Sequence, residues 1–333
     1  GHRGKDNAGA AMCAYAELER FDVLKIQSID TVSQSFHARC FVQLRLRGAK
    51  DRREAFVTFG NGATKSVEWF AGRIEVLNSF KHDSCKLIDE KPTVRDDGED
   101  LLIQLRFEGD FYQHMRLHAF PFDSQELNMD FIILCRVDGP VPTEVKVSPR
   151  VSCRLVDSGF APGFQWRPKG EVRCHAGTHE ANERTFPKFG ASVRVARESR
   201  FYVTNVALPT AVFSGLAFTL FAAQPSEPME RLSVAFTLLL TMAAYKITVT
   251  DMIPQVSYET LLDQFLLCNF FLLVAMAVVS AVLPQAGQDA EDLADRVCLA
   301  LLGAIWCLIQ AWFVAKAWSR ERSERLGRGG LVI

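Results

Sequence analysis

The chain has 333 residues with 38 Lys and Arg against 39 Asp and Glu, so its formal net charge is −1. This balance excludes a protein that binds nucleic acid or a membrane surface through a broad basic face. Apolar residues make up 48% and charged residues 23% of the chain, which excludes an intrinsically disordered protein. The sequence divides into a charged, strand-like part, 1–199, an apolar part, 200–325, and a short tail, 326–333.

The first part is typical of β-structure, although residues 8–20 are compatible with a short amphipathic helix. Largely alternating apolar segments recur, separated by turn sequences such as Asp96-Asp97-Gly98. About nine or ten strands over roughly 180 residues predict one all-β, immunoglobulin-like sandwich. We expect the 25 phenylalanines of the chain to supply most of the aromatic core. The expected strands are 21–29, 36–47, 54–59, 74–77, 101–107, 127–135, 144–155, 164–174 and 191–197.

Nine cysteines are scattered along the chain without a CxxC pair, so zinc-ribbon and thioredoxin-like motifs are not supported. Cys153 and Cys174 are able to pair in an oxidising compartment, but spacing alone does not decide between a bridge and free thiols. Cys174, His175 and His179 are possible metal ligands, although histidines also gather at hairpin tips by chance, and we expect no metal site. The sequence begins with Gly1, so we expect a signal peptide to have been removed or to lie outside it.

The second part predicts an all-α, four-helix transmembrane domain. Uncharged apolar blocks cover 201–223, 264–288 and 297–315, and each is about long enough to cross the ~30 Å hydrocarbon core as a helix. A fourth segment lies between the first two blocks and is bounded by charges at both ends. The expected helices are 201–223, 229–251, 258–284 and 291–318.

The second of these helices carries a periodic stripe. Its members recur at steps of four and three, which places them on one face of a helix. Small polar residues on a spanning helix are often packing contacts between helices. The alternative is a pore wall, in which hydroxyls replace hydration water, an apolar belt dewets and acidic rings select cations; such a pore needs several copies of the chain around an axis. The stripe consists of Ser233, Thr237, Leu240, Ala244, Ile247 and Asp251, preceded by Glu230.

Several short motifs occur in the same order and at the same spacing as in one known protein family. The sequence from Phe120 to Gln125, Phe-Pro-Phe-Asp-Ser-Gln, resembles the central signature of the pentameric ligand-gated ion channels, also called Cys-loop or Pro-loop receptors. Further matching features lie at family spacing from about residue 20 to 320. They are the loop 29–36, Trp69, Ala207-Leu208-Pro209, Glu230-Arg231-Leu232, Leu240 and Pro254.

The sequence also departs from this family in ways that indicate a branch. Gln113 and Leu127 stand where eukaryotic members place the cysteines of the signature disulfide, so the chain resembles the cysteine-free Pro-loop branch. The connection from the third to the fourth helix is only 284–296, as in bacterial or algal members. Leu46, Gly48 and Ala71 also replace common family residues.

The resemblance implies a homopentamer around a central pore, in a multi-pass plasma-membrane protein whose N-terminal domain is extracellular. A carboxylate ring at each mouth raises the local cation concentration, so we expect a ligand-gated channel for monovalent cations, with Arg231 turned away from the lumen. We expect the hydrophobic gate at Leu240, Ala244 and Ile247. Glu230 has an alternative role as a favourable charge at the helix N-terminus.

The sequence leaves two alternative functions open. An anion-selective channel of the same family and a membrane-anchored binding receptor without conduction are the alternatives. An enzyme is not expected, because the sequence has no HExxH, GxSxG, P-loop or GxGxxG motif before a helix. No cofactor and no nucleic-acid partner are expected.

Gating requires a two-state contact between the sandwich and the helices. The resemblance places Arg197 where it is able to pair with Asp123; the alternative is an ordinary salt bridge at a domain boundary, worth about 0–1 kcal/mol if exposed. The expected coupling residues are Thr31, Val32, Phe120, Pro121, Phe122, Asp123, Arg197 and Pro254.

The agonist site is weakly specified. Family members often hold a cationic amine in an aromatic box between subunits, but few aromatic residues fall at the matching loops, and those present are also compatible with core packing. Gating by protons, a small acid or another metabolite is equally open. The candidate ligand residues are Phe80, Arg136, Phe186 and Phe189.

The hypothesis that the second helix lines a pore does not explain two groups of charged residues. Lys246 lies about 140° from the stripe centre at 100° per residue, and we expect a structural partner within the subunit rather than a modulatory site. The C-terminal segment is basic, and the positive-inside rule would place it in the cytoplasm. We keep the family orientation because a signal peptide translocates a long domain regardless of later charge. These basic residues are Lys316, Arg320, Arg322, Arg325 and Arg328.

Overall fold

The computed structural model describes residues 16–48, 74–81, 84–88, 93–134, 144–163, 165–181, 184–222, 228–282 and 288–326. The chain forms two compact units, one of 1–115 and 125–195 and one of 116–124 and 196–333. The expected strand 54–59 and the residues Trp69, Ala71 and Arg136 lie outside the described residues.

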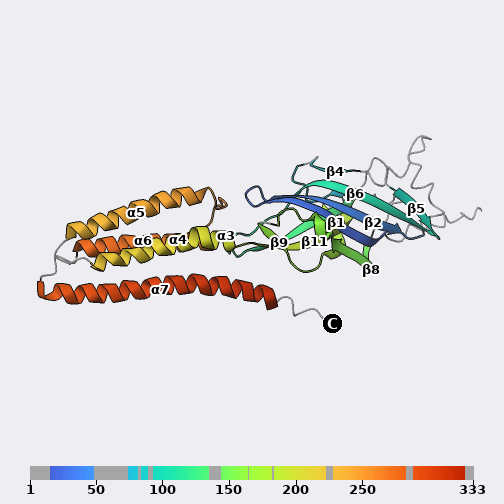
Figure 1. Ribbon diagram of the computed structural model, residues 1–333. Coiled ribbons are helices and arrows are strands. Elements are labelled where there is room, and N and C mark those ends of the chain that lie inside the picture. Colours follow the sequence, from blue (N-terminus) through green and yellow to red (C-terminus); the bar gives the residue numbers. More distant parts are fainter. Residues whose placement is uncertain are drawn as a thin grey trace, which may run out of the picture. The chain divides into compact units, whose positions relative to one another are not determined.

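Six strands form the first sheet of the sandwich, in the order β4–β6–β2–β1–β8 with β5 paired to β6 (Figure 1). β1 pairs antiparallel with β2 and parallel with β8. Because β1 begins at Ala16, residues 16–20 are a strand and not the end of the expected helix; Ala16 and Leu18 are buried, and pairing on both sides fixes the extended form. The bounds are β1 Ala16–Asp30, β2 Ser35–Leu46, β4 Cys85–Leu87, β5 Thr93–Asp97, β6 Asp100–Tyr112 and β8 Val145–Leu155.

Five strands form the second sheet, in the order β10–β11–β7–β3 with β9 paired to β11. β10 and β11 form a hairpin in which Ala181 faces Arg184. The segment 164–174, expected as one strand, contains the short β9 and the start of β10 instead. The bounds are β3 Ile74–Val76, β7 Ser124–Ile133, β9 Trp166–Pro168, β10 Arg173–Ala181 and β11 Arg184–Arg197.

The core of the sandwich is built on phenylalanine, as the composition predicts. β2 alternates between buried and half-buried residues along its whole length, so one face of the sheet is apolar. Phe131 of the second sheet lies with its ring centroid 4.7 Å from that of Phe107 and 6.0 Å from that of Phe21, both of the first sheet. Aromatic contacts of this kind add to the burial of area that holds the two sheets together.

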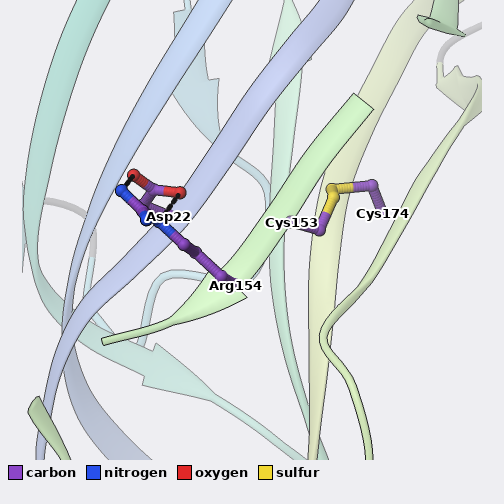
Figure 2. The surroundings of a disulfide bond; sticks show 4 residues. All are labelled: Asp22, Cys153, Arg154 and Cys174. Atoms are coloured by element: carbon purple, nitrogen blue, oxygen red, sulfur yellow. Dashed lines mark hydrogen bonds and ion pairs between the residues drawn. A yellow bond between two sulfur atoms is a disulfide. The ribbon is translucent and has the colours of Figure 1, made fainter. Parts of the chain in front are cut away.

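A disulfide between Cys153 on β8 and Cys174 on β10 also joins the two sheets. Figure 2 shows that neighbouring β8 residues point to opposite sides, Cys153 to Cys174 and Arg154 to Asp22. The Cα atoms of the two cysteines are 6.3 Å apart, within the range that a bridge requires. The structure thus decides the alternative that the spacing left open, and it also removes Cys174 from the possible metal cluster.

We expect that the double substitution Cys153→Ser/Cys174→Ser will lower the free energy of unfolding of the sandwich by about 2–4 kcal/mol, because the unfolded chain regains the freedom of the closed loop. The bridge spans 21 residues. Thermal unfolding of the full chain in detergent, with and without a reducing agent, measures this. Reduction should lower the first transition of the wild type but not that of the variant, and the exposed free thiol variant Cys307→Ser should behave as wild type. Equal transitions in all three would contradict the prediction.

Among its described residues, the second unit contains four helices long and apolar enough to cross a membrane, over 200–221, 229–250, 261–282 and 293–319. They lie side by side (Figure 1). The first span is irregular: α3 Arg200–Tyr202 leads into a π-helical turn, Val203–Ala207, then into α4 Leu208–Leu216 and a 3₁₀ segment, Ala217–Ala222. The others are α5 Pro228–Thr250, α6 Leu261–Val282 and α7 Gln288–Leu326, so α7 extends to the start of the expected tail.

Candidate functional site

α5 buries one side against its own unit and leaves the stripe open. Its buried residues are Arg231, Ala235, Met242 and Val249. The side chains of Leu240 and Ile247 are each 74% exposed within the single chain. Every other stripe residue, Glu230, Ser233, Thr237, Ala244 and Asp251, is also exposed. The hydroxyl side of α5 is therefore not enclosed by the described helices of its own subunit.

The hydroxyl groups of this exposed face donate inward to the helix backbone. Thr237 Oγ1 donates to the Ser233 carbonyl oxygen at 2.8 Å, and Thr241 Oγ1 to that of Thr237 at 2.7 Å. With its proton so used, each hydroxyl oxygen keeps lone pairs for outside donors or cations. This arrangement suits a surface that replaces the hydration shell of a cation.

The two ends of the stripe carry carboxylates without a partner in the described part of the chain. Glu230 lies in the first turn of α5, where the helix dipole favours a negative charge. Asp251 follows the last turn. Both side chains are exposed. The dipole contact of Glu230 and an electrostatic role toward solvent are thus compatible.

Arg231, the residue after Glu230, points the other way. Its Nη1 and Nη2 atoms donate to the two carboxylate oxygens of Asp295 on α7, at 2.6 and 3.1 Å. The Arg231 side chain is 1% exposed and its guanidinium lies 5.8 Å from the ring centroid of Phe221. This orientation agrees with the expectation from the sequence, whereas Asp295 was not identified there because no local motif marks it.

The loop 116–124, which carries the Phe-Pro signature, belongs to the helical unit by its contacts. The backbone N–H groups of Leu261 and Leu262, at the start of α6, donate to the carbonyls of His118 and Phe120 at 3.1 and 3.2 Å. The Leu117 N–H donates to the Tyr258 hydroxyl oxygen at 2.9 Å. The first turn of α6 leaves such N–H groups without helical partners, so the signature loop caps α6.

Asp123 and Arg197 form the buried ion pair that the resemblance predicted. Arg197 Nε donates to Asp123 Oδ1 at 2.8 Å and Nη2 to Oδ2 at 3.4 Å, while the Arg197 N–H bonds the Asp123 carbonyl at 3.1 Å. Their side chains are 4% and 1% exposed. Arg197 also lies 4.9 Å from the ring centroid of Phe120. The pair is therefore not an exposed boundary salt bridge; it fixes the signature loop to the strand that leads into the first span.

A hydrogen bond also links the first span to α5. Pro209 has no N–H, so the carbonyl of Asn205 four residues earlier loses its helical donor. The Tyr245 hydroxyl on α5 donates to this carbonyl. The π-helical turn at 203–207 is the backbone adjustment at the same place. The sequence showed Pro209 but gave no signal for Tyr245.

A cavity of about 420 Å³ lies between α5, α6 and the connection 253–259, which contains Pro254. Lys246, Tyr258 and Leu266 are among its lining residues. Lys246 is exposed and has no hydrogen bond or ion pair within the described ranges. The partner expected for Lys246 within the subunit is thus not found among the described residues, and the lysine lines this cavity instead.

The β1–β2 loop is held in shape by Asp30. The carboxylate accepts from the Val32 N–H at 2.8 Å and the Ser33 N–H at 3.3 Å. Partial burial opposes ionisation, but the hydrogen bond from the Ser33 side chain, together with those from the two N–H groups, outweighs it and lowers the pKa of Asp30. Thr31 is buried and Val32 is 63% exposed, so this loop presents one apolar side chain at its tip.

The candidate ligand residues are dispersed. Phe189 is fully buried and stacks on Phe131 at 5.5 Å, so it is a core residue and the expected ligand role is wrong for it. Phe186 is half-buried on β11, and Phe80 is 38% exposed beside the ammonium of Lys81. The structure forms no aromatic box from these residues within one chain.

On the second sheet, Asp130, His175 and Lys188 form a cluster of ionisable side chains. His175 Nε2 is 2.7 Å and Lys188 Nζ 2.9 Å from the carboxylate of Asp130. Burial opposes ionisation of Asp130, but the hydrogen bonds and charges of His175 and Lys188 prevail and lower its pKa. In the described part of the chain, no group of three or more His, Cys, Asp or Glu residues is arranged to hold a metal ion.

Comparison with known proteins gives distant relatives, while no protein-family model matches the chain. It is 24% identical over 190 residues to neuronal acetylcholine receptor subunit alpha-10 of Rattus norvegicus, covering 56% of this chain and 41% of the relative. It is 22% identical over 214 residues to subunit alpha-9 of the same receptor type from Gallus gallus, covering 62% and 42%. It is 23% identical over 304 residues to pH-sensitive chloride channel 2 of Drosophila melanogaster, covering 84% and 55%. The chain spans about half the length of these relatives.

The relatives are receptor subunits and a channel by name, and not enzymes. The architecture is a two-sheet β-sandwich followed by four apolar helices that mark an integral membrane protein. By distant homology and by this architecture, the chain is related to the Cys-loop, or pentameric ligand-gated ion channel, superfamily.

Proposed function

We propose that the chain is the subunit of a homopentameric, cation-selective ligand-gated ion channel of the plasma membrane, in the Pro-loop branch without the signature disulfide. An extracellular small molecule or protons act on the sandwich and open a pore lined by α5. The observation that carries the proposal is the exposed stripe of α5. Its hydroxyl, apolar and acidic residues are all open within one subunit, and copies around an axis would enclose them around water.

A hydrogen bond lies where other members of the superfamily have the signature disulfide. Gln113 stands at one of the two cysteine positions, and its Oε1 accepts from the Asn128 N–H at 3.2 Å, next to the other position at Leu127. A hydrogen bond therefore links the segments that a disulfide links elsewhere in the superfamily. This supports the assignment to the Pro-loop branch.

The Cys153–Cys174 bridge supports an extracellular sandwich, because stable disulfides form in oxidising compartments. Orientation by loop charge is a weaker argument, since long domains are translocated regardless of the charge that follows. With the sandwich outside, Asp251 lies at the outer mouth and Glu230 at the cytoplasmic mouth.

Cation selectivity rests on Glu230. At an effective dielectric constant near 20, one charge at ~6 Å is worth about 3 kcal/mol before screening. A ring of glutamates attracts cations and opposes anions, and the neighbouring Arg231 does not cancel it while bound to Asp295. The second candidate is an anion-selective channel, favoured by the name of the chloride-channel relative.

The proposal is tested by recording reversal potentials across membranes that contain the full chain, under NaCl gradients and after steps of pH or application of small amines. We expect a current whose reversal follows the cation gradient. Glu230→Gln should lower the Na⁺-to-Cl⁻ permeability ratio by about tenfold, since even half of the estimated interaction energy is worth that factor.

The matched control is Glu259→Gln, which removes another exposed carboxylate of the helical unit that is not on the stripe. The control should keep the wild-type ratio. An unchanged ratio in Glu230→Gln would refute the role of Glu230. A chloride-following reversal in the wild type would favour the second candidate, and no current despite confirmed surface expression would favour a binding receptor without conduction.

A further inference from the structure

The cavity between α5, α6 and the connection 253–259 has a volume of about 420 Å³ and is lined by both apolar and charged side chains. Leu266 and Leu267 form part of its apolar wall and lie in the second turn of α6, which begins at Leu261. At 1.5 Å per residue, these two leucines are roughly 8 Å from that end of the helix. The apolar wall therefore belongs to the membrane-spanning part of the bundle.

Lys246 brings a positive charge to the cavity from within a span. It lies one turn before the last residue of α5, Thr250, and its side chain is exposed. Within the described ranges, Lys246 makes no hydrogen bond or ion pair. An ionisable side chain inside a membrane-spanning segment is costly unless it meets water or a partner, so it commonly marks a functional site. Its ammonium group is a donor that suits an anionic group such as a phosphate.

Glu259, on the connection that leads into α6, brings a negative charge to the same cavity. Its side chain is exposed and has no partner in the part of the chain that the structure describes. Asp263, the other acidic lining residue, is already used: its Oδ2 accepts from the Thr260 N–H at 3.0 Å and from the Thr260 hydroxyl at 2.7 Å. Because these bonds cap the first turn of α6, Glu259 is the acidic lining residue that remains available to a ligand.

Tyr258 adds a neutral donor to the lining of the cavity. Its hydroxyl oxygen accepts from the Leu117 N–H at 2.9 Å, and a phenol that accepts still has its own proton to donate. None of the described residues takes up this proton. The Tyr258 ring stacks on that of His118 with the centroids 4.0 Å apart, so two contacts hold the hydroxyl in place. The cavity thus offers both an ammonium and a hydroxyl donor to an acceptor group.

The apolar, basic and acidic groups follow one order along the bundle. The leucines lie inside a span, Lys246 lies one turn from the end of its span, and Glu259 lies beyond the spans on the connection. A phospholipid with a zwitterionic head has the same order of acyl chains, phosphate and ammonium. A fatty acid, or a phospholipid without an ammonium group, would place only negative charge beside Glu259, which is unfavourable. The order of charges therefore favours a zwitterionic head over a purely anionic one.

We propose that this cavity is a binding site for a zwitterionic phospholipid such as phosphatidylethanolamine. The phosphate contacts Lys246 and Tyr258, and the ammonium contacts Glu259. One acyl chain lies along Leu266 and Leu267. The site is separate from the stripe of α5 and from the extracellular trigger of the proposed channel. Lipid binding is measured without any current, so it is tested independently of the channel function.

The experiment measures the dissociation constant of the first bound lipid by native mass spectrometry of the full chain in detergent. Three probes with the same dioctanoyl chains differ only in their heads: phosphatidylethanolamine, phosphatidylglycerol and diacylglycerol. The wild type should bind the ethanolamine lipid about fivefold more tightly than the glycerol phospholipid, since one charge contact near a membrane surface is worth about that factor. Diacylglycerol, which lacks the phosphate, should bind most weakly.

Substitutions assign the two charge contacts separately. Lys246→Met should weaken binding of both phospholipids about fivefold without affecting diacylglycerol, whereas Lys246→Arg keeps the charge and should bind as the wild type. Glu259→Gln should remove the preference for the ethanolamine lipid over the glycerol phospholipid. The matched control is Lys316→Met, because Lys316 is an exposed lysine within the span of α7 that does not line the cavity. This control should keep all three dissociation constants.

Equal affinity of the wild type for the three lipids, or an unchanged affinity in Lys246→Met, would overturn the site and leave Lys246 as a lysine that extends into water. Tighter binding of phosphatidylglycerol than of phosphatidylethanolamine would overturn the ammonium contact and with it the zwitterionic ligand. A preference for the ethanolamine lipid that survives in Glu259→Gln would overturn the same contact. Should Lys246→Met not fold, the head preferences of the wild type and of Glu259→Gln decide.

Discussion

Replacing Asp123 with asparagine is expected to lower the thermal stability of the full chain and to abolish most of the triggered current. The side chains of Asp123 and Arg197 are 1% and 4% exposed. Removing one partner of a buried ion pair costs about 3–5 kcal/mol in other proteins. The same change releases the signature loop, whose carbonyls cap α6. Thermal unfolding in detergent and current amplitude at a saturating trigger measure the two effects.

An exposed ion pair serves as the control, because it shows how much of the effect on stability depends on burial of the pair. Lys146 and Glu144 form an ion pair at 3.3 Å in which both side chains are about half exposed. Glu144→Gln should change stability by no more than about 1 kcal/mol and leave the current intact. Arg197→Lys keeps the charge but loses the bidentate geometry, so an intermediate loss is expected.

The double variant Asp123→Leu/Arg197→Met tests whether the pair also transmits gating. Apolar replacement of both partners often restores stability. Restored melting with a current still impaired would indicate a role in coupling, and restored melting with restored current would reduce the pair to a packing element. An Asp123→Asn protein that matches Glu144→Gln in both measurements would contradict the prediction altogether.

The elements that follow from the sequence are those with a strong local period. β2 alternates cleanly between buried and half-buried residues, and its limits fall within two residues of the expected 36–47. The stripe of α5 repeats at helical spacing, and every member is exposed within the single chain. The short strands β4 and β5 were missed because they are edge strands of three and five residues, defined by pairing with β6 rather than by any pattern of their own.

The contacts that escaped prediction are those between residues far apart in the chain. Arg231 and Asp295 are separated by 64 residues, and no sequence motif predicts that they pair. Tyr245 meets the carbonyl of Asn205 only because Pro209 vacates it. Residue type also does not predict which role a phenylalanine has: Phe80 lies in a bend after β3 and is partly exposed, while Phe189 lies on β11 and belongs to the core.

Replacing Leu240 with serine is expected to give a channel that conducts without any trigger. Leu240 is 74% exposed within one subunit, at the middle of the stripe. In the proposed pentamer its side chains would form an apolar constriction, and such a constriction stops ions by losing its water. Hydroxyl groups would retain water there. Because one substitution acts in every subunit, about 0.3 kcal/mol per subunit already sums to a roughly tenfold shift toward the conducting state. The standing current in untreated membranes measures this shift.

Leu308→Ser is the matched control, since Leu308 on α7 is 68% exposed and not on the stripe. It removes the same apolar group from a similarly open position, so loss of hydrophobic area alone would affect both variants alike. If only Leu240→Ser raises the standing current, the effect belongs to the ion path. A standing current that is equal in both variants, or absent in Leu240→Ser at confirmed surface expression, would mean that the exposed face of α5 packs against a neighbouring subunit and encloses no water.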